Sequence, residues 1–97
     1  MITFFETPHF SQWLSKLKDL KGRMSIVRRI DRAQLGNFGD IKSVGEGVSE
    51  MRIDSGPGYR LYYMKQEEMV VILLVGGDKS SQERDIVKAK ELAKEYK

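Results

Sequence analysis

The spacing of apolar residues changes near the middle of this chain, and that change restricts the fold more than any other feature. Up to Leu35, apolar residues recur every three to four positions, which is the period of helices that bury one face. From Val48 to Asp54, apolar and charged residues alternate, which is the period of a half-buried strand. A helical half followed by a half built of strands predicts an α+β fold in which helices pack on an antiparallel sheet.

The first half predicts a short strand and two helices. After a strand at Ile2–Glu6, Thr7 and Pro8 supply an N-cap and a first helical residue. The first helix is expected to end at Gly22 and the second to cover Arg23–Leu35. Their buried faces would consist of Phe10, Trp13, Leu14, Leu17 and Leu20 in the first helix and of Ile26, Val27, Ile30 and Ala33 in the second. We therefore expect a helical hairpin at the N-terminus.

The second half predicts a meander of three strands, with a shorter strand at Ile41–Val44 before it. In the first of the three, Met51 and Ile53 are expected to point inward, and the charged side chains of Glu50, Arg52 and Asp54 outward. The turn Ser55-Gly56-Pro57-Gly58 leads into Tyr59–Met64, and a second turn leads into Met69–Val75, which is apolar on both faces and therefore central.

A final helix follows the last strand. Ser80 and Glu83 have the spacing of a capping box, and the apolar face would consist of Ile86, Ala89, Ala93 and Tyr96. The predicted order is β-α-α-β-β-β-α. Because 97 residues cannot supply two stable hydrophobic cores, we predict one domain, residues 1–97.

Several function classes are disfavoured by residues that the sequence lacks. There is no cysteine, hence no disulfide and no cysteine-ligated zinc. The single histidine, His9, has no companion ligand or base nearby, which indicates a surface or capping role. The start of the chain lacks the features of a secretory signal, and Met69–Val75 is too short to span a bilayer. We expect a cytoplasmic protein without a metal, a small-molecule cofactor or contact with a membrane.

Positive charge is concentrated in the predicted hairpin. The chain has a formal charge of +3, while the segment from Phe10 to Leu35 alone carries seven basic and two acidic residues. Arg28, Arg29 and Arg32 share one side of the second helix and are candidate RNA contacts. Two interpretations stay open: a surface for a polyanion or an acidic protein, and an ordinary solvated helical face.

A second group of cations is expected at the edge of the sheet. Arg52 and Arg60 lie on strands predicted to be adjacent, and two like charges side by side are best tolerated where an anion neutralises them. Lys79 precedes a helix whose first N–H groups are free to bind phosphate. The alternatives are an ordinary capped helix and cross-strand pairing with Glu50 and Asp54. Three tyrosines alternate with these cations and could stack on bases or pack in the core: Tyr59, Tyr62 and Tyr63.

These same segments resemble a known family. The run Gly58-Tyr59-Arg60-Leu61-Tyr62-Tyr63 and the segment Gly76–Gln82 are similar to the RelE/ParE toxin superfamily. The segments Glu50–Ile53 and Asp85–Lys90 resemble its HigB-like branch, the addiction-module killer or phage-derived toxin-like proteins. The resemblance implies a RelE-like fold and a bacterial or phage toxin of a type II toxin-antitoxin system. It also implies an mRNA interferase, an endoribonuclease that cuts messenger RNA on the ribosome and inhibits translation.

The resemblance also implies roles for individual residues. The reaction would be a metal-independent attack of a ribose 2′-hydroxyl on the neighbouring phosphate, with Arg60 neutralising the transition state and Lys79 holding the phosphate or protonating the leaving oxygen. Arg52 matches a catalytic strand lysine, whereas Glu50 reverses the charge of the preceding one. No residue matches the family's late tyrosine, which leaves the general base unassigned. Further RNA contacts would be Tyr62, Ser81 and Gln82.

The implied partners are messenger RNA, the ribosome and a cognate antitoxin with a helix-turn-helix domain, similar to HigA. Two other functions stay open. One is a ParE-like poison of DNA gyrase that cuts no RNA. The other is a non-enzymatic, decayed phage-derived module whose basic hairpin binds an acidic partner.

Overall fold

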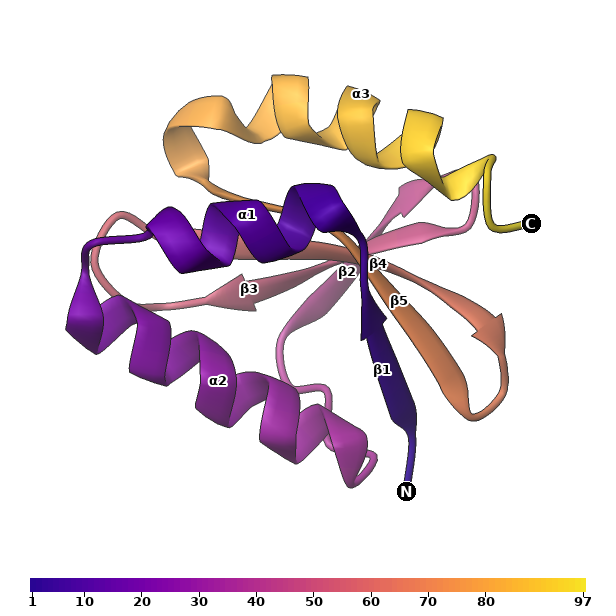
Figure 1. The fold of residues 1–97 in the computed structure, drawn as a ribbon, viewed down its shortest axis with the longest axis horizontal. Helices are drawn as coiled ribbons and strands as arrows, with labels where there is room; N and C mark the ends of the chain where they lie inside the picture. The colour runs from indigo at the N-terminus through magenta and orange to yellow at the C-terminus, as the bar shows by residue number, and fades with distance from the viewer.

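The computed structural model describes residues 1–97 as a five-stranded sheet with three α-helices (Figure 1). The elements are β1 (Thr3–Glu6), α1 (Pro8–Lys16), α2 (Leu20–Gln34), β2 (Ile41–Gly45), β3 (Val48–Ile53), β4 (Tyr59–Glu67), β5 (Val70–Asp78), a 3₁₀ turn η1 (Lys79–Ser81) and α3 (Gln82–Ala93). The predicted α+β fold is confirmed, and the short strand expected at Ile41–Val44 is β2. None of the helices has the length and apolar character that crossing a bilayer requires.

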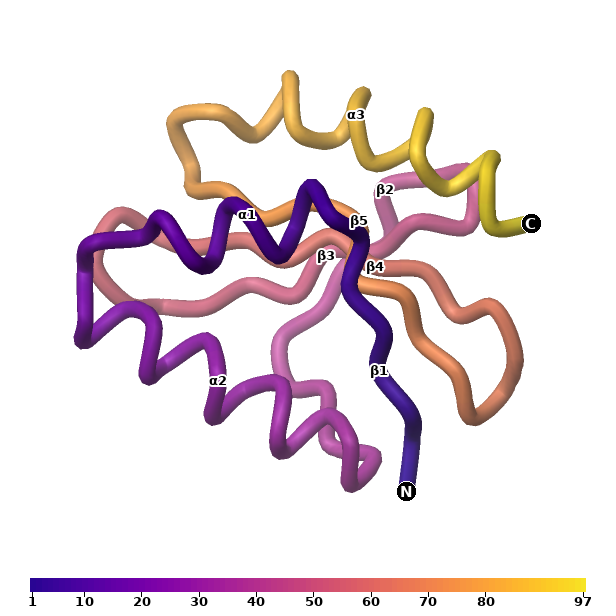
Figure 2. The backbone as a smooth tube through the Cα atoms, in the orientation of Figure 1, coloured from indigo at the N-terminus to yellow at the C-terminus, as the bar shows by residue number.

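The strands lie in the order β1-β5-β4-β3-β2. Strands β3 to β5 form the expected antiparallel meander, and β2 extends it by pairing antiparallel with β3. The first strand differs, because it pairs in parallel with β5 from Thr3 opposite Val70 to Glu6 opposite Leu73. The two helices after β1 carry the chain to the far edge of the sheet, and the meander then returns to β1 (Figure 2).

Helices cover both faces of the sheet. One core cluster lies under α1 and α2 and includes Phe10, Ile26 and Leu61, and a second lies under α3 and includes Tyr62 and Ala89. The layers follow from the sequence, because β4 and β5 are apolar on both sides and need a cover on each.

The expectation that Glu50 points outward is wrong. Its side chain is only 2% exposed. Glu50 shares a face of β3 with Val48, and α3 packs over that face. The carboxylate of Glu50 is therefore buried by α3, a helix that begins more than thirty residues later in the sequence.

The break between the first two helices also differs from the prediction. The first helix ends at Lys16, and α2 begins after Asp19, whose carboxylate accepts a hydrogen bond of 3.0 Å from the Gly22 amide. Gly22 therefore lies inside α2, where it does not end a helix. It allows Tyr59 of β4 to approach the helix backbone.

Replacing this glycine by alanine should destabilise the protein. A Cβ at position 22 would lie 2.5 Å from Cε2 of Tyr59 and 2.6 Å from Oδ2 of Asp19. Helix propensity alone favours alanine by about 1 kcal/mol, but forced repacking costs about 1–3 kcal/mol. We expect Gly22→Ala to lower the free energy of unfolding in urea, while Lys21→Ala, at an exposed neighbouring position, leaves it nearly unchanged. A gain in stability for Gly22→Ala would contradict this packing.

Candidate functional site

Three cations meet where β3 ends, β4 begins and β5 leads into α3. Arg52 lies directly opposite Arg60 across the β3–β4 ladder, and Arg60 lies opposite Gly77 of β5. Lys79 follows β5 and folds over Gly58, where an added Cβ would be 3.3 Å from both Cγ and Cδ of the lysine. We call Arg52, Arg60 and Lys79 the cationic cluster. All three predicted catalytic residues are thus side by side.

The cationic cluster lines an open depression of about 520 Å³. Its other walls are Asp40, Ile53, Asp54 and the turn residues Gly56, Pro57 and Gly58. The turn is tight, because Gly56 and Gly58 have φ values of 52° and 80°, a region that favours glycine. Three cations against two carboxylates give the depression a net positive charge, which suits a phosphodiester.

Arg52 is held by an acid at the rim. Its Nη2 donates a hydrogen bond of 2.8 Å to Oδ1 of Asp40. This hydrogen bond, and then the charge of Asp40, raise the pKa of Arg52 above its usual value. Nε of Arg52 is buried without a hydrogen-bond partner. One face of this guanidinium is therefore neutralised within the protein, while the residue still lines the depression.

Arg60 is backed by the buried carboxylate of Glu50. The distance from Nε of Arg60 to Oε2 of Glu50 is 4.0 Å, and Gln82 donates a hydrogen bond of 3.1 Å from Nε2 to the same oxygen. Nε of Arg60 has no hydrogen-bond partner, and the side chain is 12% exposed. Glu50 attracts this guanidinium from behind the depression, which makes Glu50 a positioning residue for Arg60.

Sequence reasoning named Glu50 as a possible cross-strand charge partner, in agreement with its 4.0 Å contact with Arg60, but it missed that Glu50 is buried, although one signal for this was present. Val48 has the same orientation in β3, and an apolar residue on that face indicates a covered surface. Gln82, predicted to contact RNA, is occupied by its hydrogen bond to Glu50.

The junction between β5 and α3 is not the predicted capping box. Asp78, rather than Ser80, starts the 3₁₀ turn, and its Oδ1 accepts hydrogen bonds from the amide and the hydroxyl of Ser80 at 2.8 and 2.5 Å. Ser81 stands at the N-cap of α3, but its Oγ donates to Oδ2 of Asp85 at 2.6 Å. Ser81, predicted to contact RNA, is half-buried, and its hydroxyl is engaged by this buried acid. Gly77 leaves room for that acid, since a Cβ there would clash with the Asp85 carboxylate.

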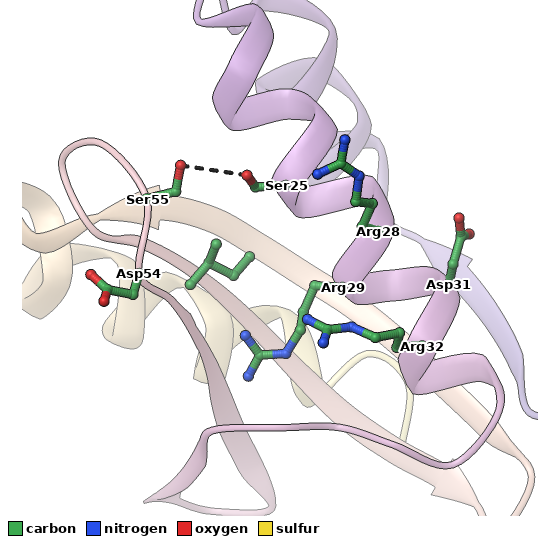
Figure 3. Close-up of a pocket in the computed structure, with 8 residues that line it drawn as sticks. Ser25, Arg28, Arg29, Asp31, Arg32, Asp54 and Ser55 are labelled. Carbon is green, nitrogen blue, oxygen red and sulfur yellow. Dashed lines mark hydrogen bonds between the residues drawn. The ribbon is translucent and has the colours of Figure 1, made fainter.

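The three arginines predicted to contact RNA from α2 have different environments. Arg28 and Arg32 are exposed and line a depression of about 690 Å³ together with Ser25, Ser55 and two acids, Asp31 and Asp54 (Figure 3). The hydroxyls of Ser25 and Ser55 lie 3.5 Å apart and link α2 to the β3–β4 turn. This depression adjoins the one at the cationic cluster, because Ile53 and Asp54 line both.

The prediction that Arg29 contacts RNA is wrong, because this residue has a structural role. It is 7% exposed, and its guanidinium donates to three backbone carbonyl groups: those of Phe38 at 2.9 Å, Asp40 at 2.9 Å and Arg52 at 2.7 Å. Burial lowers the pKa of Arg29 from its usual value, and the charge of Arg32 lowers it further. The side chain ties α2 to β3 and to the segment before β2.

The tyrosines of β4 pack inside the protein. Tyr59, Tyr62 and Tyr63 are all buried, so the expectation that Tyr62 contacts RNA is wrong. The hydroxyl of Tyr62 has no hydrogen-bond partner, and burial, followed by the charge of Glu50, raises the pKa of this group. Tyr59 donates a hydrogen bond of 2.7 Å to Oδ2 of Asp19, and burial first and this hydrogen bond second raise its pKa to about 12.

The raised pKa of Tyr59 predicts a loss of stability in alkali. The folded protein keeps a proton that the unfolded chain releases near pH 10, so the contribution of Tyr59 is complete below about pH 10 and is lost as the pH approaches about 12. We expect the free energy of unfolding in urea to fall across this interval, and to fall less steeply in Tyr59→Phe. Equal slopes for the two proteins would show that Tyr59 does not contribute.

His9, the single histidine, lies away from the cationic cluster. His9 lines a separate depression between α1 and the start of α3, together with Trp13, Gly77 and Asp85. No group of three or more His, Cys, Asp or Glu side chains is placed to hold a metal ion.

Comparison with known proteins finds two similarities. A family model described as "Phage derived protein Gp49-like (DUF891)" matches residues 12–97. A protein of Haemophilus influenzae (strain ATCC 51907 / DSM 11121 / KW20 / Rd), described as an uncharacterized protein, is 58% identical over 86 residues, which cover 89% of this chain and 87% of the relative. The cationic cluster lies within the residues that the family model matches.

Proposed function

The chain belongs to the phage-derived Gp49-like family, and we propose that it is a toxin of the RelE/ParE superfamily that cleaves messenger RNA on the ribosome. The observation that carries the proposal is the direct pairing of Arg52 with Arg60 beside Lys79 in an open depression. Two arginines opposite one another across a ladder repel; Asp40 and Glu50 each offset one of them from within the protein, and a phosphodiester in the depression would offset the cluster from the open side.

The residues of the depression support a cleavage that proceeds by charge stabilisation. When the ribose 2′-hydroxyl loses its proton to solvent and attacks the adjacent phosphorus, negative charge increases on the phosphate oxygens; the P–O5′ bond breaks as the new bond forms, which leaves a 2′,3′-cyclic phosphate and a 5′-hydroxyl. Arg60 would neutralise this charge, because an arginine cannot lose its proton at neutral pH. Lys79, which is exposed, would hold the phosphate or give a proton to the leaving 5′-oxygen.

The neighbouring depression in Figure 3 extends this surface. Arg28 and Arg32 stand across the shared residues Ile53 and Asp54 from the cationic cluster, so they would contact the phosphates of flanking nucleotides. Arg29, Tyr62, Ser81 and Gln82 have no part in this proposed contact, because their polar groups are buried or engaged within the protein.

The isolated protein should cleave free RNA poorly. No histidine lines the depression, and in-line placement of the 2′-hydroxyl supplies much of the acceleration in such reactions. We expect translating ribosomes to provide that placement and to raise the rate of cleavage by two or more orders of magnitude, on the order of the effect of orienting the reactants. The measurement is primer extension on messenger RNA incubated with the protein, with and without ribosomes. Equally fast cutting of naked RNA would contradict ribosome dependence.

The same experiment in cells separates the proposed function from the other functions. After induction, codon-associated cuts indicate the nuclease, whereas DNA breaks with intact messages indicate a gyrase poison. Growth arrest that survives both Arg60→Ala and Lys79→Ala would exclude the cationic cluster as the source of toxicity. A helix-turn-helix antitoxin is part of the proposal, and its co-expression should restore growth.

A further inference from the structure

A row of large apolar side chains lies uncovered on α2. Leu20, Met24 and Val27 are 68%, 49% and 46% exposed, and their spacing places them on one face of the helix. The buried residues of the helix, among them Ile26 and Ala33, face the sheet. We call Leu20, Met24 and Val27 the apolar stripe. It faces away from the sheet, and no other part of the chain covers it.

Arginines border the apolar stripe on both sides. Arg23 and Arg28 line the same shallow depression of about 330 Å³ as Leu20, Met24 and Val27, and no acidic residue lines it. Arg23 lies one residue before Met24, and Arg28 lies four residues, or slightly more than one turn, after it. With 3.6 residues per turn, these offsets place Arg23 on one side of the stripe and Arg28 on the other. An exposed apolar patch with a charged rim is typical of a protein-binding surface.

We propose that the apolar stripe binds an amphipathic helix of a protein partner that has acidic residues on both sides of its apolar face. The apolar centre would meet the apolar face of that helix, and its acids would pair with Arg23 and Arg28. A second copy of this chain fits poorly, because the rims of two identical stripes would place arginines against arginines. Nucleic acid fits poorly too, because its phosphates gain nothing from the apolar centre.

This inference goes beyond the proposed RNA cleavage, because the apolar stripe shares no residue with the cationic cluster; of its rim, Arg28 also lines the depression proposed to contact flanking nucleotides, so the separating variant is made at Met24. Met24 is exposed and lies outside the cationic cluster. We therefore expect Met24→Glu to weaken partner binding at least about tenfold without changing RNA cleavage. Loss of one activity is then distinguishable from loss of the other.

The test uses defined synthetic peptides and the full chain. One fluorescent peptide of about 18 residues, long enough to form a helix when bound, has leucine at positions i, i+4 and i+7 with glutamate on both sides, and a matched peptide has lysine in place of every glutamate. We expect fluorescence anisotropy to give the glutamate peptide at least about tenfold higher affinity, with the difference falling as salt is added.

Surface variants then locate the binding. Met24→Glu should weaken the glutamate peptide at least about tenfold. Val87→Glu is the matched control, because Val87 is 60% exposed but lies on α3. Reversing both rim charges with Arg23→Glu and Arg28→Glu should invert the preference in favour of the lysine peptide. Circular dichroism checks that each variant is folded.

Several results would overturn the inference. These are equal affinity for the two peptides, an equal loss in Met24→Glu and Val87→Glu, or no binding of the glutamate peptide at millimolar concentration. A dimer in sedimentation that Met24→Glu dissociates would assign the stripe to a second copy. Binding to phosphatidylglycerol vesicles that depends on Met24, without peptide binding, would assign it to a lipid surface.

Discussion

Arg60→Ala should lower ribosome-dependent RNA cleavage by about 10²–10³-fold and abolish growth arrest. The guanidinium of Arg60 lines the depression with Arg52 and Lys79, and the buried carboxylate of Glu50 attracts it from behind. A positioned cation of this kind stabilises charge that appears only in the transition state, so its removal lowers the rate of the chemical step more than it weakens RNA binding. The measurement is single-turnover cleavage on programmed ribosomes.

Two further variants make this result interpretable. Arg84→Ala removes an exposed arginine of α3 that lies outside the depression, and it should cleave like the unchanged protein. Arg60→Lys keeps the charge but loses the planar fork, so an intermediate rate is expected. Because removal of Arg60 leaves Glu50 buried without its cation, thermal unfolding must show that Arg60→Ala is folded at the assay temperature. A folded Arg60→Ala protein with full activity would exclude charge stabilisation by this residue.

Arg29→Ala should cost about 3–5 kcal/mol of stability. Its guanidinium donates to the carbonyl groups of Phe38, Asp40 and Arg52, which belong to the segment before β2 and to β3. The alanine variant removes the guanidinium donor from all three carbonyl groups, although that of Asp40 also accepts from the backbone amide of Arg52 at 2.9 Å, and it opens a cavity between α2 and the sheet. Urea denaturation at neutral pH measures the loss.

Arg28→Ala is the control for this stability measurement. Arg28 is the neighbouring residue of α2, but it is exposed and makes no ion pair, so its replacement should change stability by no more than about 0.5 kcal/mol. Equal losses for Arg28→Ala and Arg29→Ala would show that the three carbonyl contacts contribute little. Arg29→Lys should also destabilise, because a single ammonium cannot reach three acceptors in the geometry of a guanidinium.

The fold could be predicted where local spacing determines structure. The change of period marks the helical and sheet halves, and short turns determine the meander from β3 to β5. Two features could not be read from local spacing. The parallel pairing of β1 depends on a partner strand that begins at Val70, and the break between the helices depends on the N-cap that Asp19 forms for α2 rather than on Gly22.

The cationic cluster was predictable for the same reason. The turn between β3 and β4 is short enough to place Arg52 opposite Arg60, and Lys79 follows the strand next to them. The burial of Glu50 behind the cationic cluster could not be predicted in this way. Alternation along β3 shows which residues share a face of the strand, but it does not show whether a helix covers that face. Arg29 carried a signal that was overlooked, since it lies three residues after Ile26 and four before Ala33, on the buried face of α2.

The position of β1 has a consequence for the order in which a newly made chain can assemble. β1 is synthesised before the other strands, but its hydrogen-bond partners, Val70 to Leu73, lie about 67 residues later along the chain. Contacts between distant residues form late, because the intervening chain must first be closed into a loop. Until β5 has been synthesised, Arg60 has no Gly77 beside it, and Lys79 does not yet exist. A nascent chain therefore cannot form the cationic cluster until the ribosome has translated the part of its messenger RNA that encodes β5 and Lys79.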